Sequence, residues 1–311
     1  MQNVATTSTA PLSVSQTLHT ACERHPALAT LITHFSALYS AHAELIPKLT
    51  EKMAEDANCP EPVLHKGRLQ QGVPVLADAS LEWAESYYPD IAEGLFEPLS
   101  QIGTMQQSVE LYQTAIADKK LSITDLLSAV QDSNESALTQ HAATAGMEYG
   151  TLLFITQQIL HSLLSAYVAV HNAAFEKIFW REAYCPVCGS FPDISTLQRP
   201  DPDQSEFLAG GGGKKMMHCS TCSHEWHFRR GTCPACNHDE VGAIHYFHVE
   251  DNSAERVEYC EKCKTYLNNI DLRNSTTTPD LTVAPLTLIH LDMQAAQKKL
   301  KPLVRSLWNT F

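Results

Sequence analysis

The sequence has few basic residues for its length. Its 311 residues include 22 Lys and Arg against 35 Asp and Glu, a formal net charge of -13. Even the cysteine-rich window 181–273 contains ten Arg or Lys against fourteen Asp or Glu. Proteins that bind nucleic acid or an anionic membrane surface need clustered positive charge. The charge balance therefore argues against both kinds of partner, and an acidic surface suits a protein partner better.

The sequence also lacks the short motifs of common catalytic sites. It has no Gly-x-Ser-x-Gly elbow, no His-Glu-x-x-His helix and no dinucleotide-binding fingerprint. A glycine run from Gly210 to Gly213 precedes Lys214 and Lys215, but Lys215 stands where a phosphate-binding loop needs Ser or Thr. The composition predicts a flexible turn there, and Lys214-Lys215 and Arg229-Arg230 read as isolated, solvated doublets. We therefore expect a protein that is not an enzyme.

No long apolar run is free of polar breaks. From Gln140 to Lys177, apolar side chains recur at steps of three and four residues, but Gln157, Gln158 and His161 interrupt them. A membrane span needs about twenty predominantly apolar residues, so this segment predicts a core helix of a bundle. Met1 to Gln16 lacks the basic start and apolar stretch of a secretory signal. These observations predict a cytoplasmic protein without membrane insertion.

The first 180 residues predict an all-α domain. They contain no cysteine pair and little alternation of apolar and polar residues, while helical periodicity extends over four further segments, at residues 27–54, 75–87, 104–117 and 123–130. Turns are expected at Cys59-Pro60-Glu61-Pro62, Tyr88-Pro89-Asp90 and Ala117-Asp118-Lys119. Cys22 and Cys59 are read as unpaired thiols, with Cys22 buried as a small hydrophobe.

The feature that is present is a series of four Cys-x-x-Cys pairs in one short window. They are Cys185/Cys188, Cys219/Cys222, Cys233/Cys236 and Cys260/Cys263. A spacer of two residues lets both sulfurs of a pair reach one ion, so two pairs complete a tetrahedral Cys₄ site. Gly189 and Asn237, which follow two of the pairs, suit the positive φ that such a knuckle needs. The sequence therefore predicts two metal ions held by these eight cysteines.

Strand patterns flank the knuckles and favour two small β modules. Alternation of polar and apolar residues marks residues 225–229, 245–249, 257–259 and 266–270. Sequential pairing closes the shorter loops, so pairs one and two form a first module and pairs three and four a second; interleaved pairing stays open. We expect a helical domain at 1–180, metal modules at 181–230 and 231–273, and a linker with a C-terminal segment at 274–311. Modules this small need their ions to fold, so we expect them to melt on chelation while the helical domain survives.

Other uses of the cysteines fit less well. A disulfide framework belongs to secreted chains, and a thioredoxin-like dithiol needs a helix after a strand in a βαβ unit, which no pair has. Histidines also crowd the window, and His218, adjacent to Cys219, is the best candidate to replace a thiolate. Eight cysteines already fill two sites, so we read the histidines as neighbours of the ligands. Thiolate ligands alone do not choose between iron and zinc.

The residues around the pairs resemble the FdhE family, the formate dehydrogenase accessory proteins. The matching stretches are Cys185-Pro-Val-Cys-Gly-Ser-Phe-Pro192, His218-Cys-Ser-Thr-Cys-Ser-His-Glu-Trp226, Arg230-Gly-Thr-Cys-Pro-Ala-Cys236 and Tyr259-Cys-Glu-Lys-Cys-Lys-Thr-Tyr266. All eight paired cysteines fall on family positions. The resemblance is specific over residues 181–272 and poor in motifs over the helical half.

The resemblance implies a function that the spacing does not show. It implies a cytoplasmic factor needed for active respiratory formate dehydrogenase, which contacts the catalytic subunit of that enzyme before export and carries iron in rubredoxin-like sites. Two other classes stay open. One is a rubredoxin-like electron carrier, which leaves the helical domain without a role. The other is a nucleic-acid-binding zinc ribbon, which the charge disfavours.

Overall fold

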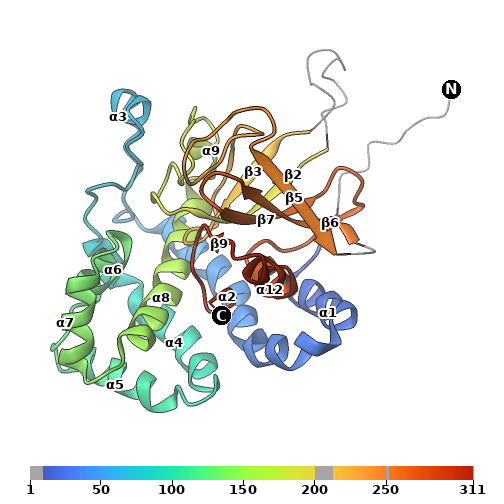
Figure 1. Ribbon diagram of the computed structural model, residues 1–311. Coiled ribbons are helices and arrows are strands. Elements are labelled where there is room, and N and C mark those ends of the chain that lie inside the picture. Colours follow the sequence, from blue (N-terminus) through green and yellow to red (C-terminus); the bar gives the residue numbers. More distant parts are fainter. Residues whose placement is uncertain (1–9, 200–212, 250–251, 311) are drawn as a thin grey trace.

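The computed structural model describes residues 10–199, 213–249 and 252–310. A bundle of helices forms one side of the molecule and a twisted sheet forms the other (Figure 1). The C-terminal segment returns between them, so that α12 (Ile289–Gln297) lies under the sheet near α1 (Val14–Arg24). The predicted fold class is confirmed: a helical N-terminal half precedes a sheet region with two zinc-ribbon-like Cys₄ modules.

The bundle is built around α8 (Tyr149–Val170), which packs against six neighbouring helices. Besides α1, the helices before and after it are α2 (Ala29–Glu55), α3 (Lys66–Gln70), α4 (Tyr88–Ser100), α5 (Gln106–Ala117), α6 (Ile123–Gln131), α7 (Glu135–Ala145) and α9 (Asn172–Phe175). By length and composition α8 alone among the described helices is apolar enough to cross a membrane, but 61% of its apolar window is buried inside the protein. That burial agrees with the predicted core helix.

Local sequence signals explain several helix ends. The Ser13 hydroxyl and the Gln16 side chain form a reciprocal capping box at the start of α1. Gly146 ends α7 with φ 68°, a left-handed conformation that costs glycine little. This stop divides the segment from Gln140 to Lys177, which periodicity alone predicts as continuous. Pro89, expected in a turn, instead lies in the first turn of α4, where a missing N–H group costs nothing.

The helix predicted over residues 75–87 is wrong. The chain there forms turns and a short 3-10 helix, η2 (Glu82–Ser86), and Asp78 has φ 64°. The reason is tertiary: the N–H groups of Val75 and Leu76 donate to the carbonyls of Pro186 and Val187, at 2.8 and 2.9 Å. These bonds hold the chain against the first knuckle, and the left-handed backbone at Asp78 interrupts a right-handed helix.

The sheet contains all four strands expected from alternation and three more. Its strands are β2 (Pro192–Leu197), β3 (Lys215–Cys219), β4 (Glu225–His227), β5 (Ile244–Val249), β6 (Asn252–Cys260) and β7 (Thr265–Asp271), in the order β4-β3-β2-β7-β6-β5, with β9 (Lys301–Pro302) beside β7. Neighbours are antiparallel except that β2 and β9 run parallel to β7. Each predicted module therefore supplies an antiparallel ribbon, and the β2–β7 pairing joins both into one sheet.

The C-terminal segment is more structured than a linker. Thr277 and Thr278 form β8, which pairs with β1 (Ala10–Pro11) near the N-terminus, and α11 (Ala284–Thr287) follows. Leu286, Leu288 and Leu291 of this segment are fully buried. The domain limits expected from the sequence stay a prediction.

The expectation that the Lys214-Lys215 doublet is solvated is wrong for Lys215. Its side chain is buried within β3 and forms an ion pair with Glu258 of β6. The glycines at 210–212, with most of the expected flexible turn, lie outside the described residues. Arg229 and Arg230 are exposed, as expected.

Candidate metal centres

Four backbone loops of one kind present the eight cysteines. In each pair, the N–H group four residues after the first cysteine donates to the carbonyl of that cysteine, at 2.9 to 3.3 Å. The donor residue has a left-handed φ in every case: Gly189 85°, Ser223 56°, Asn237 56° and Lys264 58°. The sequence predicted this conformation at Gly189 and Asn237. Ser223 and Lys264 carry no such signal, since neither residue type favours positive φ.

The loops also direct N–H groups at the sulfurs. The backbone N–H of Val187 lies 3.4 Å from Cys185 Sγ, that of Thr221 3.4 Å from Cys219 Sγ, and that of Ala235 3.4 Å from Cys233 Sγ. Such donors stabilise a thiolate, because hydrogen bonds to the charged form favour it. The knuckles are therefore prepared to carry negative sulfur.

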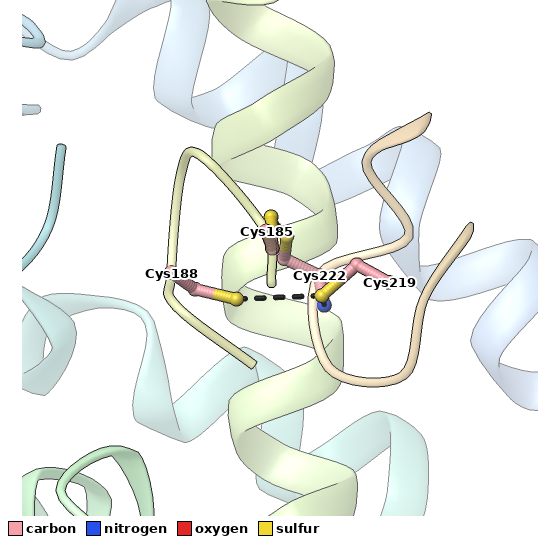
Figure 2. A group of neighbouring side chains, drawn as sticks. All are labelled: Cys185, Cys188, Cys219 and Cys222. Atoms are coloured by element: carbon pink, nitrogen blue, oxygen red, sulfur yellow. Dashed lines mark hydrogen bonds between the residues drawn. The ribbon is translucent and has the colours of Figure 1, made fainter. Parts of the chain in front are cut away.

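The first centre unites Cys185, Cys188, Cys219 and Cys222 (Figure 2). The Sγ atoms of Cys185 and Cys222 are 3.6 Å apart and those of Cys188 and Cys219 are 3.4 Å apart. Metal–sulfur bonds of about 2.3 Å in a tetrahedron place two sulfurs about 3.8 Å apart. The two measured separations are within a few tenths of an ångström of that value, and all four sulfurs lie within 4.8 Å of one another.

The first centre is embedded in the helical bundle. All four cysteines are buried, three of them with 0% exposure, and they belong to the same apolar core as α2, α4 and α8. His161 of α8 contacts the second knuckle through its Nδ1, 3.0 Å from the Thr221 carbonyl. Trp226 donates from its indole to the Glu182 carbonyl at 3.3 Å. The knuckles are thus held by tertiary contacts as well as by their own loops.

Ionisation of the four buried thiols in this centre requires a cation to balance the negative charge. Burial raises the pKa of the Cys219 and Cys222 thiols well above the ordinary value, whereas hydrogen bonds from Cys185 and the other two cysteines lower the pKa of Cys188. Burial therefore opposes the simultaneous ionisation of these sulfurs. Four thiolates become tolerable only when a metal ion balances them.

The second centre, formed by Cys233, Cys236, Cys260 and Cys263, lies nearer the surface. The Sγ atoms of Cys233 and Cys263 are 3.6 Å apart and those of Cys236 and Cys260 are 3.8 Å apart. Cys236 is exposed and Cys263 is half-buried. Burial opposes ionisation of Cys263, but hydrogen bonds from the hydroxyl and backbone of Thr265 outweigh it and lower the pKa of Cys263 to about 7.

Both donor sets suit a tetrahedral ion. The sulfurs in each cluster lie within 4.8 Å of one another, and each cluster can hold one metal ion. The structure groups the pairs sequentially, as loop closure predicts, and not in the interleaved order. Cys22 and Cys59 are free thiols, and Cys22 is half-buried. An ion in either centre would supply structural crosslinking and, if it were iron, a change of oxidation state.

His218 does not replace a thiolate. Its Nδ1 lies 2.9 Å from Oδ1 of Asp193 across β2 and β3. Burial disfavours the charged imidazole, but the Asp193 carboxylate outweighs burial and raises the pKa of His218. The Asp193 carboxylate therefore pairs with His218 beside the first centre, and His218 neighbours the ligands as predicted.

A cavity of about 690 Å³ opens between the bundle and the sheet. Its lining includes Cys188 to Phe191, His218, Ser220 and Thr221 from the sheet side, and Gln158 and His161 from α8. The C-terminal stretch from Pro302 to Asn309 also lines it. The sequence did not predict this cavity, because its walls come from segments that are far apart in the chain. The polar breaks in α8 were the one signal: Gln157, Gln158 and His161 all line it.

The fold and the clusters define a class of protein: a helical domain joined to a pair of zinc-ribbon-like thiolate centres. No family model matches the chain. A protein of Aquifex aeolicus named "Protein FdhE homolog" is 26% identical over 237 residues, which are 75% of this chain and 73% of that protein. Protein FdhE of Escherichia coli K12 is 28% identical over 169 residues, and this alignment covers 51% of each chain.

The FdhE protein of Pseudomonas aeruginosa shares the fold. Its crystal structure aligns with 95% of this chain and 94% of its own at a TM-score of 0.62, with 17% sequence identity. The resemblance to the FdhE family that the cysteine motifs predict is thereby confirmed, in sequence by the curated relatives and in fold by the crystal structure.

Proposed function

We propose that this protein is a cytoplasmic accessory factor for respiratory formate dehydrogenase, which binds the catalytic subunit before export. The observation that carries the proposal is the pair of Cys₄ centres within a fold shared with FdhE over 95% of the chain. The similar proteins are named FdhE, and the resemblance to that family implies the role in formate dehydrogenase maturation. An accessory role also uses both halves of the molecule, which a simple metal carrier does not.

The eight cysteines Cys185, Cys188, Cys219, Cys222, Cys233, Cys236, Cys260 and Cys263 are proposed to hold two ions, with iron favoured over zinc by the family resemblance. Thiolate sets of this kind accept either metal. The chain's own residues supply the knuckle turns, the N–H groups directed at sulfur and the tertiary contacts that fix the first centre. Together they form a rigid platform.

The client is proposed to bind at the cavity between bundle and sheet. Its walls combine apolar residues with polar groups such as Gln158, His161 and the Asp193–His218 pair. An extended or helical segment of a partner protein fits a groove that offers both. The acidic character of the chain supports a protein partner over nucleic acid.

Co-purification tests this proposal. A tagged formate dehydrogenase catalytic subunit, isolated from cells that contain this protein, should retain it, and elemental analysis of the anaerobically purified protein should give two ions per chain. The Cys219→Ala, Cys222→Ala variant should lose one ion and dehydrogenase maturation together. Full maturation by a variant that has lost the ion would refute the platform, and failure of the intact protein to bind the subunit would refute the accessory role.

A rubredoxin-like electron carrier is the second candidate, favoured by the exposure of Cys236. Electron exchange needs a metal close to the surface, and only the second centre has such access among the described residues. The iron-loaded protein would then show a reversible couple and reduce an acceptor in solution. A Cys236→Ala variant that loses electron transfer but still supports dehydrogenase maturation would separate the two functions.

A further inference from the structure

A third group of potential metal ligands lies away from both cysteine centres. His25 stands at the end of α1, Glu255 lies in β6 and His290 lies in α12. One potential ligand atom from each lies within 4.8 Å of those of the other two. The three residues are far apart in the sequence. They meet where α12 lies beside α1 and β6 (Figure 1).

The ligand atoms in this group lack partners. Within the described part of the chain, His25 Nε2, Glu255 Oε2 and His290 Nε2 are buried atoms that make no hydrogen bond. A buried polar atom without a partner has lost its hydrogen bonds to water and gained none in return, which is unfavourable. Three such atoms in one group are unfavourable for the folded protein, and a single cation bound among them would give all three a partner.

The existing contacts do not remove this cost. Arg24 holds the other carboxylate oxygen, with its Nη1 3.0 Å from Glu255 Oε1, and leaves Oε2 free. His290 Nε2 is 3.7 Å from Glu255 Oε2, too far for a hydrogen bond. The His25 and His290 rings stack with centroids 3.9 Å apart, so neither ring donates to the other.

We propose that His25, Glu255 and His290 form a third metal site, which binds a divalent first-row transition ion through two imidazole nitrogens and one carboxylate oxygen. This donor set suits Zn²⁺, Fe²⁺, Co²⁺ or Ni²⁺ and differs in kind from the thiolate centres. Three protein ligands leave a coordination position open, whereas a Cys₄ shell is closed. In a tetrahedral site with bonds of about 2.0–2.1 Å, neighbouring ligand atoms are about 3.4 Å apart. The three ligand atoms lie within 4.8 Å of one another, so side-chain rotations that move each atom by about 1 Å would complete the site.

The site would join three parts of the molecule. His25 belongs to the N-terminal helices, Glu255 to the ribbon that carries the second centre, and His290 to the C-terminal helix. The side chains of Glu255 and His290 are each 15% exposed, which lets an ion enter from solvent. An ion there would fix the helical half against the sheet independently of the cysteines.

Titration of the full-length protein with Co²⁺ alone tests the proposal. Two equivalents should produce intense sulfur-to-metal charge-transfer absorption, and a third should add only weak visible bands without further charge transfer. The His290→Ala and His25→Ala variants should bind two ions normally and the third at least about tenfold more weakly. His19→Ala is the matched control, because His19 and Glu23 form an exposed pair, 74% and 67% exposed.

The outcomes separate clearly. Saturation of the wild-type protein at two ions would overturn the third site without any variant. Retention of the third ion by both histidine variants would also overturn it, and far-UV circular dichroism shows whether they remain folded. Should the variants fail to fold, X-ray absorption of the third cobalt ion in the wild-type protein decides: nitrogen and oxygen ligands support the site, and sulfur ligands overturn it.

Discussion

At the scale of single residues, the knuckles depend on backbone conformation as much as on sulfur. The residue after each Cys-x-x-Cys pair has a left-handed φ, although two of the four are Ser223 and Lys264. An L-residue other than Gly, Asn or Asp pays about 1–2 kcal/mol for that conformation. The hydrogen bond that each donates back across the knuckle offsets part of this cost.

Substitution of Lys264 tests this balance. Lys264→Val should lower the free energy of unfolding of the second centre by about 1 kcal/mol, because a β-branched side chain crowds a backbone at φ 58°. Lys264→Gly should equal or exceed the wild type in stability. Denaturant unfolding of the metal-loaded protein measures both. Lys262→Val, in the same knuckle but outside the left-handed positions, is the control, and equal losses at 262 and 264 would contradict the interpretation.

His42 makes stability depend on pH. It is 2% exposed in α2, and its Nδ1 and Nε2 contact Ser162 Oγ at 2.8 Å and Gln158 Oε1 at 3.1 Å. Burial, with a smaller contribution from the neighbouring His161, lowers the pKa of His42 from 6.5 to about 3. The folded protein therefore keeps the ring neutral in a range where the unfolded chain protonates it.

A lowered pKa means that stability is complete above pH 6.5 and declines as the pH falls towards 3. Between pH 7 and pH 5 the wild type should lose about 2 kcal/mol relative to His42→Gln, since each pH unit well below 6.5 contributes about 1.4 kcal/mol. Urea unfolding of both proteins at several pH values measures the difference. Because metal release in acid affects both proteins alike, parallel pH curves would show that His42 does not titrate on unfolding.

At the scale of elements, the sequence predicts those whose signal is local. The strands β4 to β7 alternate polar and apolar residues, and α2, α5 and α6 have one apolar face. The grouping of the cysteines also follows from loop length. The helix predicted over 75–87 fails because Asp78 has φ 64° and the chain before it is held against the first knuckle, which no local pattern encodes.

The candidate sites could likewise be predicted only where their signal is local. All eight cysteines could be predicted, because Cys-x-x-Cys spacing reports a metal knuckle within four residues. The cavity and the His25, Glu255 and His290 group could not, since their members meet only after α8, β6 and α12 have packed. The burial of Lys215 has a related cause: its partner Glu258 is on β6, a strand that approaches β3 only when the chain folds.

The two centres should differ in how fast they exchange their ions. The first is enclosed by α8 and its neighbours, whereas Cys236 of the second is exposed. Competition with a chromophoric chelator should release one ion quickly and the other slowly, because exchange from a buried site needs local unfolding. Cys236→Ala should remove the fast phase and Cys188→Ala the slow one. Release of both ions in a single phase would show that exposure does not control exchange.

At the scale of the whole molecule, the first centre belongs to the bundle. Cys185, Cys188, Cys219 and Cys222 lie in the apolar core that also contains α2, α4 and α8, while the second apolar core lies between the sheet and α12. A helical domain that survives chelation unchanged, as expected from the sequence, requires the modules to fold apart from it. The shared core instead couples the first centre to the helices.

Removal of each centre in turn tests this coupling. Cys185→Ser with Cys222→Ser should lower the stability of the helical bundle by on the order of 4 kcal/mol, because the lost ion leaves polar groups within its core. Cys236→Ser with Cys263→Ser, at the exposed centre, should leave the helical transition nearly unchanged. Far-UV circular dichroism during denaturation follows the helices in both variants. If both double substitutions lowered the stability of the bundle equally, the first centre would not be specially coupled to the helices. If the first variant left the bundle unaffected, the helices would fold without the neighbouring knuckles.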